Sequence, residues 1–168
     1  MGSPVKLRKQ FEAPKRQWDA SRIKEERKLV DEYGLKNMRE LWRMKTILRK
    51  IRREARRLQS GKGKNIEQRT ELLLNRIKSF LVANATLDDV LALDTRSILE
   101  RRLQTIVTRK RMASTILQSR QFVTHGHIAI NGVRVTAPSY LVKFREENEI
   151  NWYNHVIELK NQQVNTVG

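Results

Sequence analysis

The sequence has no cysteine and only three prolines, and its longest apolar runs are four residues, at 80–83 and 90–93. Without cysteine the chain cannot form disulfides, thiolate zinc sites or cysteine nucleophiles. Runs of four are far short of the roughly 20 apolar residues that span a bilayer. The N-terminal segment also lacks the apolar core of a signal peptide. We therefore expect a cytoplasmic protein that does not bind a membrane.

Acidic residues are scarce relative to basic ones. Lys and Arg number 35 against 18 Asp and Glu, which gives a formal net charge of +17. Residues 1–84 carry 24 basic and 10 acidic groups, whereas residues 101–134 carry seven basic groups and no acid. Such an excess attracts polyanions, so nucleic acid is the first candidate partner.

The N-terminal half has the pattern of a helical domain. Residues 1–20 show no periodicity and indicate an extension, and a helix is predicted from 21 until Gly34. A second helix is predicted over 37–60, where Met44, Ile47, Leu48, Ile51, Ala55 and Leu58 form one stripe. Further helices are predicted over 67–83 and after Thr86, which is placed as an N-cap.

The second of these helices carries eight cations and a single acid, Glu54, on its central turns. A solvated face is the ordinary interpretation of a charge run. Here the like charges at i,i+4 spacing repel one another, so a phosphate-binding face explains them better. The cations are Arg43, Lys45, Arg49, Lys50, Arg52, Arg53, Arg56 and Arg57.

The basic 101–134 segment has the pattern of a helix–turn–helix. Ser97 and Glu100 have capping-box spacing, which predicts a helix that begins there and continues through Ile106. The turn is predicted at 108–112. A second helix is predicted over 113–123, with Ile116 and Leu117 buried and Gly126 just past its end.

A β-hairpin is predicted next, because Asn131-Gly132 is the strongest short signal for a two-residue type I′ turn. Such a loop pairs Ile130 with Val133 and Ala129 with Arg134. That register places Ile128, Ile130, Val133 and Val135 on an apolar face, and it places His127, Ala129, Arg134 and Thr136 on a polar face.

His125 and His127 flank Gly126 and have three interpretations. A zinc site needs three or four ligands, so His155 and a carboxylate would have to converge on the pair. A capping or hairpin-orienting role needs no partner, and contact with RNA uses the polar imidazoles directly. No proton-transfer pocket, phosphate loop, nucleophile elbow or paired-carboxylate motif is apparent. We therefore expect no catalytic residue, no metal and no cofactor.

Residues 101–142 resemble the S-four RNA-binding domain, in the run "RQFVTHGHIAING" and the following "PSY". Residues 33–58 resemble the N-terminal domain of the ribosomal S-four family in its archaeal and eukaryotic form. Arg111 departs from the domain's pattern, since a glycine is usual in this turn, and so does Ser119, since an alanine is usual there.

The resemblance implies an α+β fold, with a helical N-terminal domain and an S-four module made of a helix–turn–helix, a β-hairpin and a small antiparallel sheet. The expected domains are a basic extension (1–20), a helical rRNA-binding domain (21–96), the S-four domain (97–150) and a C-terminal tail (151–168).

The implied function is that of a structural, primary rRNA-binding protein of the small ribosomal subunit. The family acts early in assembly and lies near the mRNA entry path, beside ribosomal proteins S-three and S-five. Beyond the cations of 43–57, the expected RNA contacts are Arg101, Arg102, Arg109, Lys110, Arg111, Ser114, Gln118, Arg120, Gln121, His125, His127, Asn131 and Arg134.

Three alternatives remain. An RNA-modifying enzyme could use the module for docking but needs a catalytic domain, and a stand-alone S-four-domain protein needs no further domain. A DNA-binding helix–turn–helix regulator is disfavoured by the hairpin that directly follows the second helix.

Overall fold

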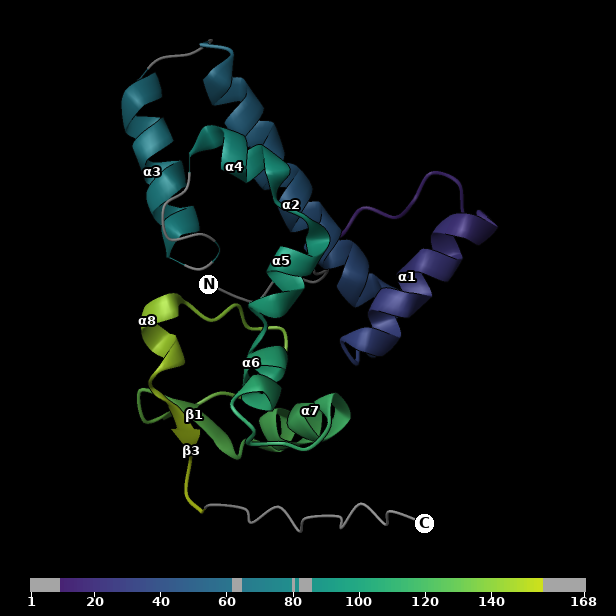
Figure 1. Ribbon diagram of the computed structural model, residues 1–168, viewed down its shortest axis with the longest axis vertical. Coiled ribbons are helices and arrows are strands. Elements are labelled where there is room, and N and C mark those ends of the chain that lie inside the picture. The colour runs from purple at the N-terminus through teal and green to yellow at the C-terminus, as the bar shows by residue number, and fades with distance from the viewer. Residues whose placement is uncertain (1–9, 62–64, 80, 82–85, 156–168) are drawn as a thin grey trace, which may run out of the picture. The chain divides into compact units, whose positions relative to one another are not determined.

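The computed structural model describes residues 10–61, 65–79, 81 and 86–155 (Figure 1). The chain forms two compact units, residues 1–101 and 102–168. In the described residues the first unit is helical and the second combines helices with a small antiparallel sheet. The predicted α+β class is confirmed.

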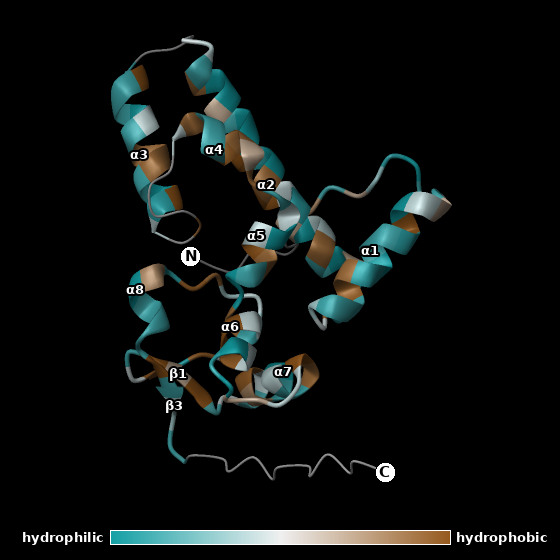
Figure 2. Cartoon of the chain, viewed as in Figure 1, coloured by the Kyte–Doolittle hydropathy of each residue, from teal (hydrophilic) through white to brown (hydrophobic). Residues whose placement is uncertain are grey.

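The long helix α2 (Met38–Gln59) is the centre of the first unit and contacts the helices around it. Its predicted apolar stripe is confirmed, since Met44, Leu48, Ile51, Ala55 and Leu58 are buried. Figure 2 shows brown, hydrophobic segments alternating with teal, hydrophilic ones along α2. The surrounding helices are α1 (Ala20–Glu32), α3 (Ile66–Lys78), α4 (Leu87–Ala92) and α5 (Thr95–Glu100).

Local signals set the ends of several of these helices. The side chain of Asp19 accepts a hydrogen bond from the amide of Arg22 at the start of α1, and Gly34 follows the end of α1 with φ of 55°. Thr86 and Asp89 form a capping box at α4, as predicted for Thr86. The predicted helix over 67–83 ends earlier, at Lys78, and part of its expected last turn (80 and 82–83) lies outside the described residues.

The second unit packs its helices against a three-stranded antiparallel sheet of order β2-β1-β3. Its core contains Leu103, Ile106, Val107, Val123, Ile128, Ile130, Val142 and Ile150. The elements are α6 (Leu103–Arg109), α7 (Ile116–His125), β1 (Ile128–Ile130), β2 (Val133–Arg134), α8 (Phe144–Glu147) and β3 (Ile150–Trp152).

The predicted hairpin is confirmed in turn and register. Asn131 and Gly132 have φ of 52° and 75°, and Ala129 pairs with Arg134 as Ile130 pairs with Val133. The predicted burial is only partly right, because Ala129 is buried and Val133 is exposed. The reason is topological: β1 is the central strand, covered on both faces, while β2 lies at the edge.

The predicted helix that starts at a Ser97–Glu100 capping box is wrong. Helix α5 already begins at Thr95 and ends at Glu100. The backbone is extended at Arg102, which forms a bridge with Leu141, and α6 begins only at Leu103. The amide of Leu103 donates to the carbonyl of Tyr140 (2.8 Å). Pairing with a distant segment therefore interrupts a helix that the local pattern favours.

The second helix of the module also differs from its prediction. Helix α7 begins at Ile116, where Thr115 is the N-cap and its hydroxyl accepts from the amide of Gln118. Leu117 is 65% exposed instead of buried, and Ser119 and Val123 are the buried side chains of α7. The buried side of α7 is thus the one that carries Ser119 and Val123, and Leu117 lies off that side.

Candidate RNA interface

Helix α7 presents a polar face away from the core of the second unit. Gln118, Gln121 and His125 recur at i, i+3 and i+7, and none of them is buried. Ser119 and Val123 recur at i and i+4 on the buried side. One helix thus joins the core and offers hydrogen-bonding groups to a ligand.

A buried glutamine, Gln104, fixes this helix against α6. Its backbone carbonyl accepts from the hydroxyl of Ser119 (2.6 Å), and its side-chain amide donates to the carbonyl of Ile116 (3.0 Å). The guanidinium of Arg120 donates to its side-chain oxygen (3.3 Å). Gln104 was not predicted as a site residue, because its only signal is a polar side chain among the apolar residues Leu103, Ile106 and Val107 of α6.

The turn between α6 and α7 carries consecutive cations. Arg109 and Arg111 are exposed, and Lys110 is half-buried. Arg111 has φ of 57°, the left-handed conformation that explains the usual glycine at this position. Ser114 follows on the surface, and its amide donates to the side-chain oxygen of Gln118 (2.8 Å).

At the other end of α7, Gly126 has φ of 78° and directs the chain into β1. Arg134 of β2 folds back over this glycine, and its guanidinium donates to the carbonyl of His125 (3.0 Å). His125, His127 and Arg134 line one open cavity of about 440 Å³, which Tyr153, Asn154 and His155 complete. Asn131 is exposed at the hairpin tip and does not line this cavity.

The cations of α2 fall into two groups. Four have acceptors within the first unit: Lys45 pairs with Glu26 (2.8 Å), Arg49 pairs with Glu12, Arg52 donates to the carbonyl of Leu93, and Arg56 donates to the carbonyl of Arg52 (3.3 Å). Others face solvent: Arg53 and Arg57, with Lys50 and Arg69, line a cavity of about 210 Å³ between α2 and α3. Arg56 is exposed and Arg43 is half-buried. Arg69 was not predicted, because its isolated position in α3 gives no cluster signal.

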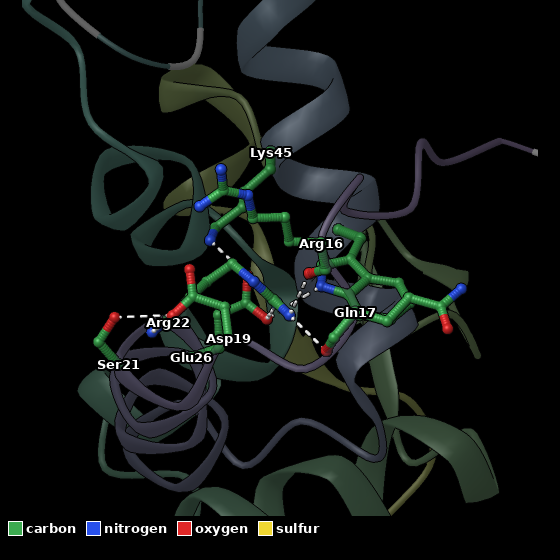
Figure 3. A network of polar contacts seen from close by, with 8 residues as sticks. Arg16, Gln17, Asp19, Ser21, Arg22, Glu26 and Lys45 are labelled. Atoms are coloured by element: carbon green, nitrogen blue, oxygen red, sulfur yellow. Dashed lines mark hydrogen bonds and ion pairs between the residues drawn. The ribbon is translucent and has the colours of Figure 1, made fainter.

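The pairing of Lys45 belongs to a network around Glu26 on α1, which is 2% exposed (Figure 3). Its carboxylate accepts from Arg22 (2.6 Å), Lys45 (2.8 Å) and the indole of Trp42 (3.1 Å). Burial alone would raise the pKa of Glu26, but its three donors, led by Lys45, outweigh burial and lower the pKa. Lys45 thus has a structural role that its place in the charge run did not indicate.

Figure 3 also shows Asp19 with Ser21 and Arg22 at the start of α1. The hydroxyl of Ser21 donates to the carboxylate of Asp19 (2.7 Å), as does the amide of Arg22 (3.2 Å). These hydrogen bonds lower the pKa of Asp19. The guanidinium of Arg22 also donates to the carbonyls of Arg16 and Gln17. Arg22 therefore binds both the segment that leads into α1 and the carboxylate of Glu26.

Two predicted contacts do not fit the structure. Arg101 is 8% exposed and Arg102 is 1% exposed. A guanidinium enclosed to this degree cannot reach a phosphate without rearrangement of the chain around it. The sequence pattern placed both on a helix surface, whereas the interruption between α5 and α6 turns them inward.

The described residues contain neither a membrane-spanning candidate nor a metal-site candidate. No described helix combines the length and apolar character that crossing a bilayer requires. In the same part of the chain, no three His, Asp or Glu side chains are grouped to hold a metal ion. The ring centroids of His125 and His127 lie 6.4 Å apart.

Comparison with known proteins identifies the family to which the chain is similar. A family model described as the S4 domain matches residues 101–148. The small ribosomal subunit protein uS4 of Methanococcus aeolicus is 50% identical over 155 residues, which cover 90% of this chain and 88% of that protein. The uS4 protein of Methanococcus vannielii is 44% identical over 170 residues, covering 99% of this chain and 96% of that protein. The similarity therefore includes both units.

Proposed function

Because the chain belongs to the family of small ribosomal subunit proteins uS4, we propose that it is a structural constituent of the small ribosomal subunit and binds the subunit's rRNA. The observation that carries the proposal is the acid-free stretch from 101 to 134. Five of its seven cations lie outside the buried core, on the turn after α6, on α7 and on β2.

This surface suits RNA backbone and shape. The exposed guanidinium groups of Arg109, Arg111 and Arg134 can each contact phosphates, and each such contact releases counterions. The amides of Gln118 and Gln121 and the imidazole of His125 can hydrogen-bond to sugars, phosphates or base edges. The solvent-facing cations of α2 and Arg69 offer a second phosphate-binding surface in the first unit.

A structural and not an enzymatic role is supported by the relatives, which are named as ribosomal proteins and match this chain over nearly their whole length. A ribosomal location implies the cytoplasm. The family resemblance also supports the finer parts of the proposal: primary binding to rRNA early in assembly, and a position near the mRNA entry path beside S-three and S-five. In this scheme residues 21–96 and 97–150 are the two rRNA-binding domains.

Sedimentation tests the proposal directly. We expect the full chain to co-sediment with small subunits through a gradient at moderate salt. A chain that remains at the top of the gradient would contradict the proposal.

A matched pair of variants tests the surface. Arg109→Ala should weaken binding to small-subunit rRNA and reduce the salt slope by roughly 0.7 to 0.9, the value for one lost phosphate contact. Arg145→Ala removes another exposed arginine, on α8 and outside the proposed surface, and should leave the slope unchanged. Equal effects of the two substitutions would show that only net charge matters.

A further inference from the structure

All three histidines of the chain line the same cavity. His125 is the last residue of α7 and of its polar face, His127 precedes β1, and His155 follows β3, so three separate segments bring them together. Tyr153 and Arg134 complete the polar and aromatic lining, and none of the lining residues within the described part of the chain is acidic. Its volume of about 440 Å³ lies within the range of pockets that hold small molecules.

Arg134 is held in place at this cavity. Its Nη2 donates to the carbonyl of His125 (3.0 Å), and its guanidinium occupies the space above Gly126. A Cβ atom at 126 would lie 1.9 Å from Nε of Arg134, so only glycine permits this approach. The remaining N–H groups of a guanidinium fixed in this way are available for an anion in the cavity.

The rings are supported from the core. His127 meets Phe122 edge-on at a centroid distance of 6.1 Å, and Phe122 in turn meets Trp152 at 5.4 Å. The amide of Tyr153 donates to the carbonyl of His127 (2.9 Å), which fixes the backbone of Tyr153 beside that histidine. His127 and Tyr153 are nonetheless exposed, so the packed side supports the rings without covering them.

Flat rings beside a fixed guanidinium are complementary to a nucleotide whose base is not paired. Proteins bind unpaired bases by stacking on aromatic rings or on guanidinium planes, and they hold the attached phosphate with cations. A duplex presents phosphates to such a cavity but keeps its bases stacked inside the helix. We propose that the cavity lined by His127, Tyr153 and Arg134 takes one unpaired RNA nucleotide, with its base stacked on the rings and its phosphate on Arg134. This inference rests on the proposed function in RNA binding.

The three histidines make the cavity directly observable. The full chain labelled with ¹³C-histidine gives imidazole signals from this site alone, because every histidine of the chain lines it. Titration with single-stranded hexaadenylate should shift these signals upfield through the ring current of the stacked base. A hexamer with the same ribose-phosphate backbone but no bases should not produce the upfield shift. It should bind about 5- to 150-fold more weakly, the factor expected for one stacked base.

A conservative pair of variants separates stacking from phosphate binding. His127→Ala should weaken hexaadenylate binding about fivefold or more and leave the abasic hexamer unaffected. His127→Phe keeps the ring and should retain the affinity. Leu117→Ala, which removes an exposed apolar side chain elsewhere on α7, should have no effect.

Four results would overturn the inference. If both hexamers bind equally, or if His127→Phe loses as much affinity as His127→Ala, the cavity holds a phosphate and no base, while the proposed function stands. If hexaadenylate binds without changing the histidine signals, RNA uses other surfaces. If neither hexamer nor small-subunit rRNA binds at low salt, the proposed function fails and this inference fails with it.

Discussion

Glu26 holds helix α1 in place, and its removal should release that helix. Glu26 is the one buried residue of α1, and its carboxylate accepts hydrogen bonds from Arg22, Lys45 and Trp42. Two of these donors come from α2, so the carboxylate links the two helices. We predict that Glu26→Ala lowers the free energy of local opening of α1. Helix α2 should stay packed on its other neighbours.

The size of the effect follows from the burial of the partners. Removing one member of a fully buried ion pair costs about 3–5 kcal/mol, because the other charge stays buried and unpaired. Here the side chains of Arg22 and Lys45 are 22% and 35% exposed, so water can rehydrate both. We therefore expect about 2–3 kcal/mol for Glu26→Ala. Glu26→Gln should cost about 1–2 kcal/mol, because it keeps an acceptor but loses the charge.

Hydrogen exchange of the α1 amides measures this opening free energy directly. The carboxylate adds a pH dependence with a definite sign. Its pKa is lowered in the folded state from the ordinary 4.5, so its stabilisation is complete above 4.5 and is lost as the pH falls through the folded-state pKa. The difference between the wild type and Glu26→Gln should therefore disappear in acid. A Glu26→Ala variant with wild-type exchange in α1 would refute this account.

Three further predictions concern single positions. Gly126→Ala should cost about 1–2 kcal/mol from its left-handed backbone and displace the guanidinium of Arg134, as seen by exchange of the β1 amides. Arg111→Gly should be more stable than Arg111→Ala by about 1 kcal/mol in urea unfolding, because alanine retains the strained φ of 57°. In rRNA titrations, Arg53→Ala should reduce the salt slope of binding by roughly 0.7 to 0.9. Lys45→Ala should chiefly weaken the packing of α1 on α2. A larger loss of salt slope for Lys45→Ala than for Arg53→Ala would contradict the division of the α2 cations.

Elements with strong local signals were predictable. The α2 stripe specifies a buried face by periodicity alone, and Thr86 with Asp89 specifies a helix start by hydrogen bonds three residues apart. Asn131-Gly132 determined the hairpin register, because glycine adopts a positive φ without strain and asparagine does so with little strain. The family resemblance, carried by motifs of the same local kind, is confirmed by the comparisons.

Features that depend on distant partners were not predictable. Glu26 is one acid in a charged helix, and its burial is decided by Trp42 and Lys45, 16 and 19 residues further along the chain. Arg102 reads as a surface cation, but its bridge with Leu141 ends the expected helix and turns the segment inward. In the candidate site, the residue types of α7 could be read from the sequence, whereas the support from Gln104 could not.

The division of the cations changes what the net charge implies about binding. A guanidinium or ammonium group that is paired with a carboxylate in the protein must share or give up that ion pair to meet a phosphate, so its net gain is small. Lys45 and Arg49 are in this position, although they belong to the same charge run as Arg53 and Arg57. The counterions released on binding rRNA should therefore follow the outward-facing cations and not the formal charge of +17. Lys45 and Arg52 also contribute to binding indirectly, because they hold α1 and the segment after α4 against α2 and so fix the helix that carries the outward-facing cations.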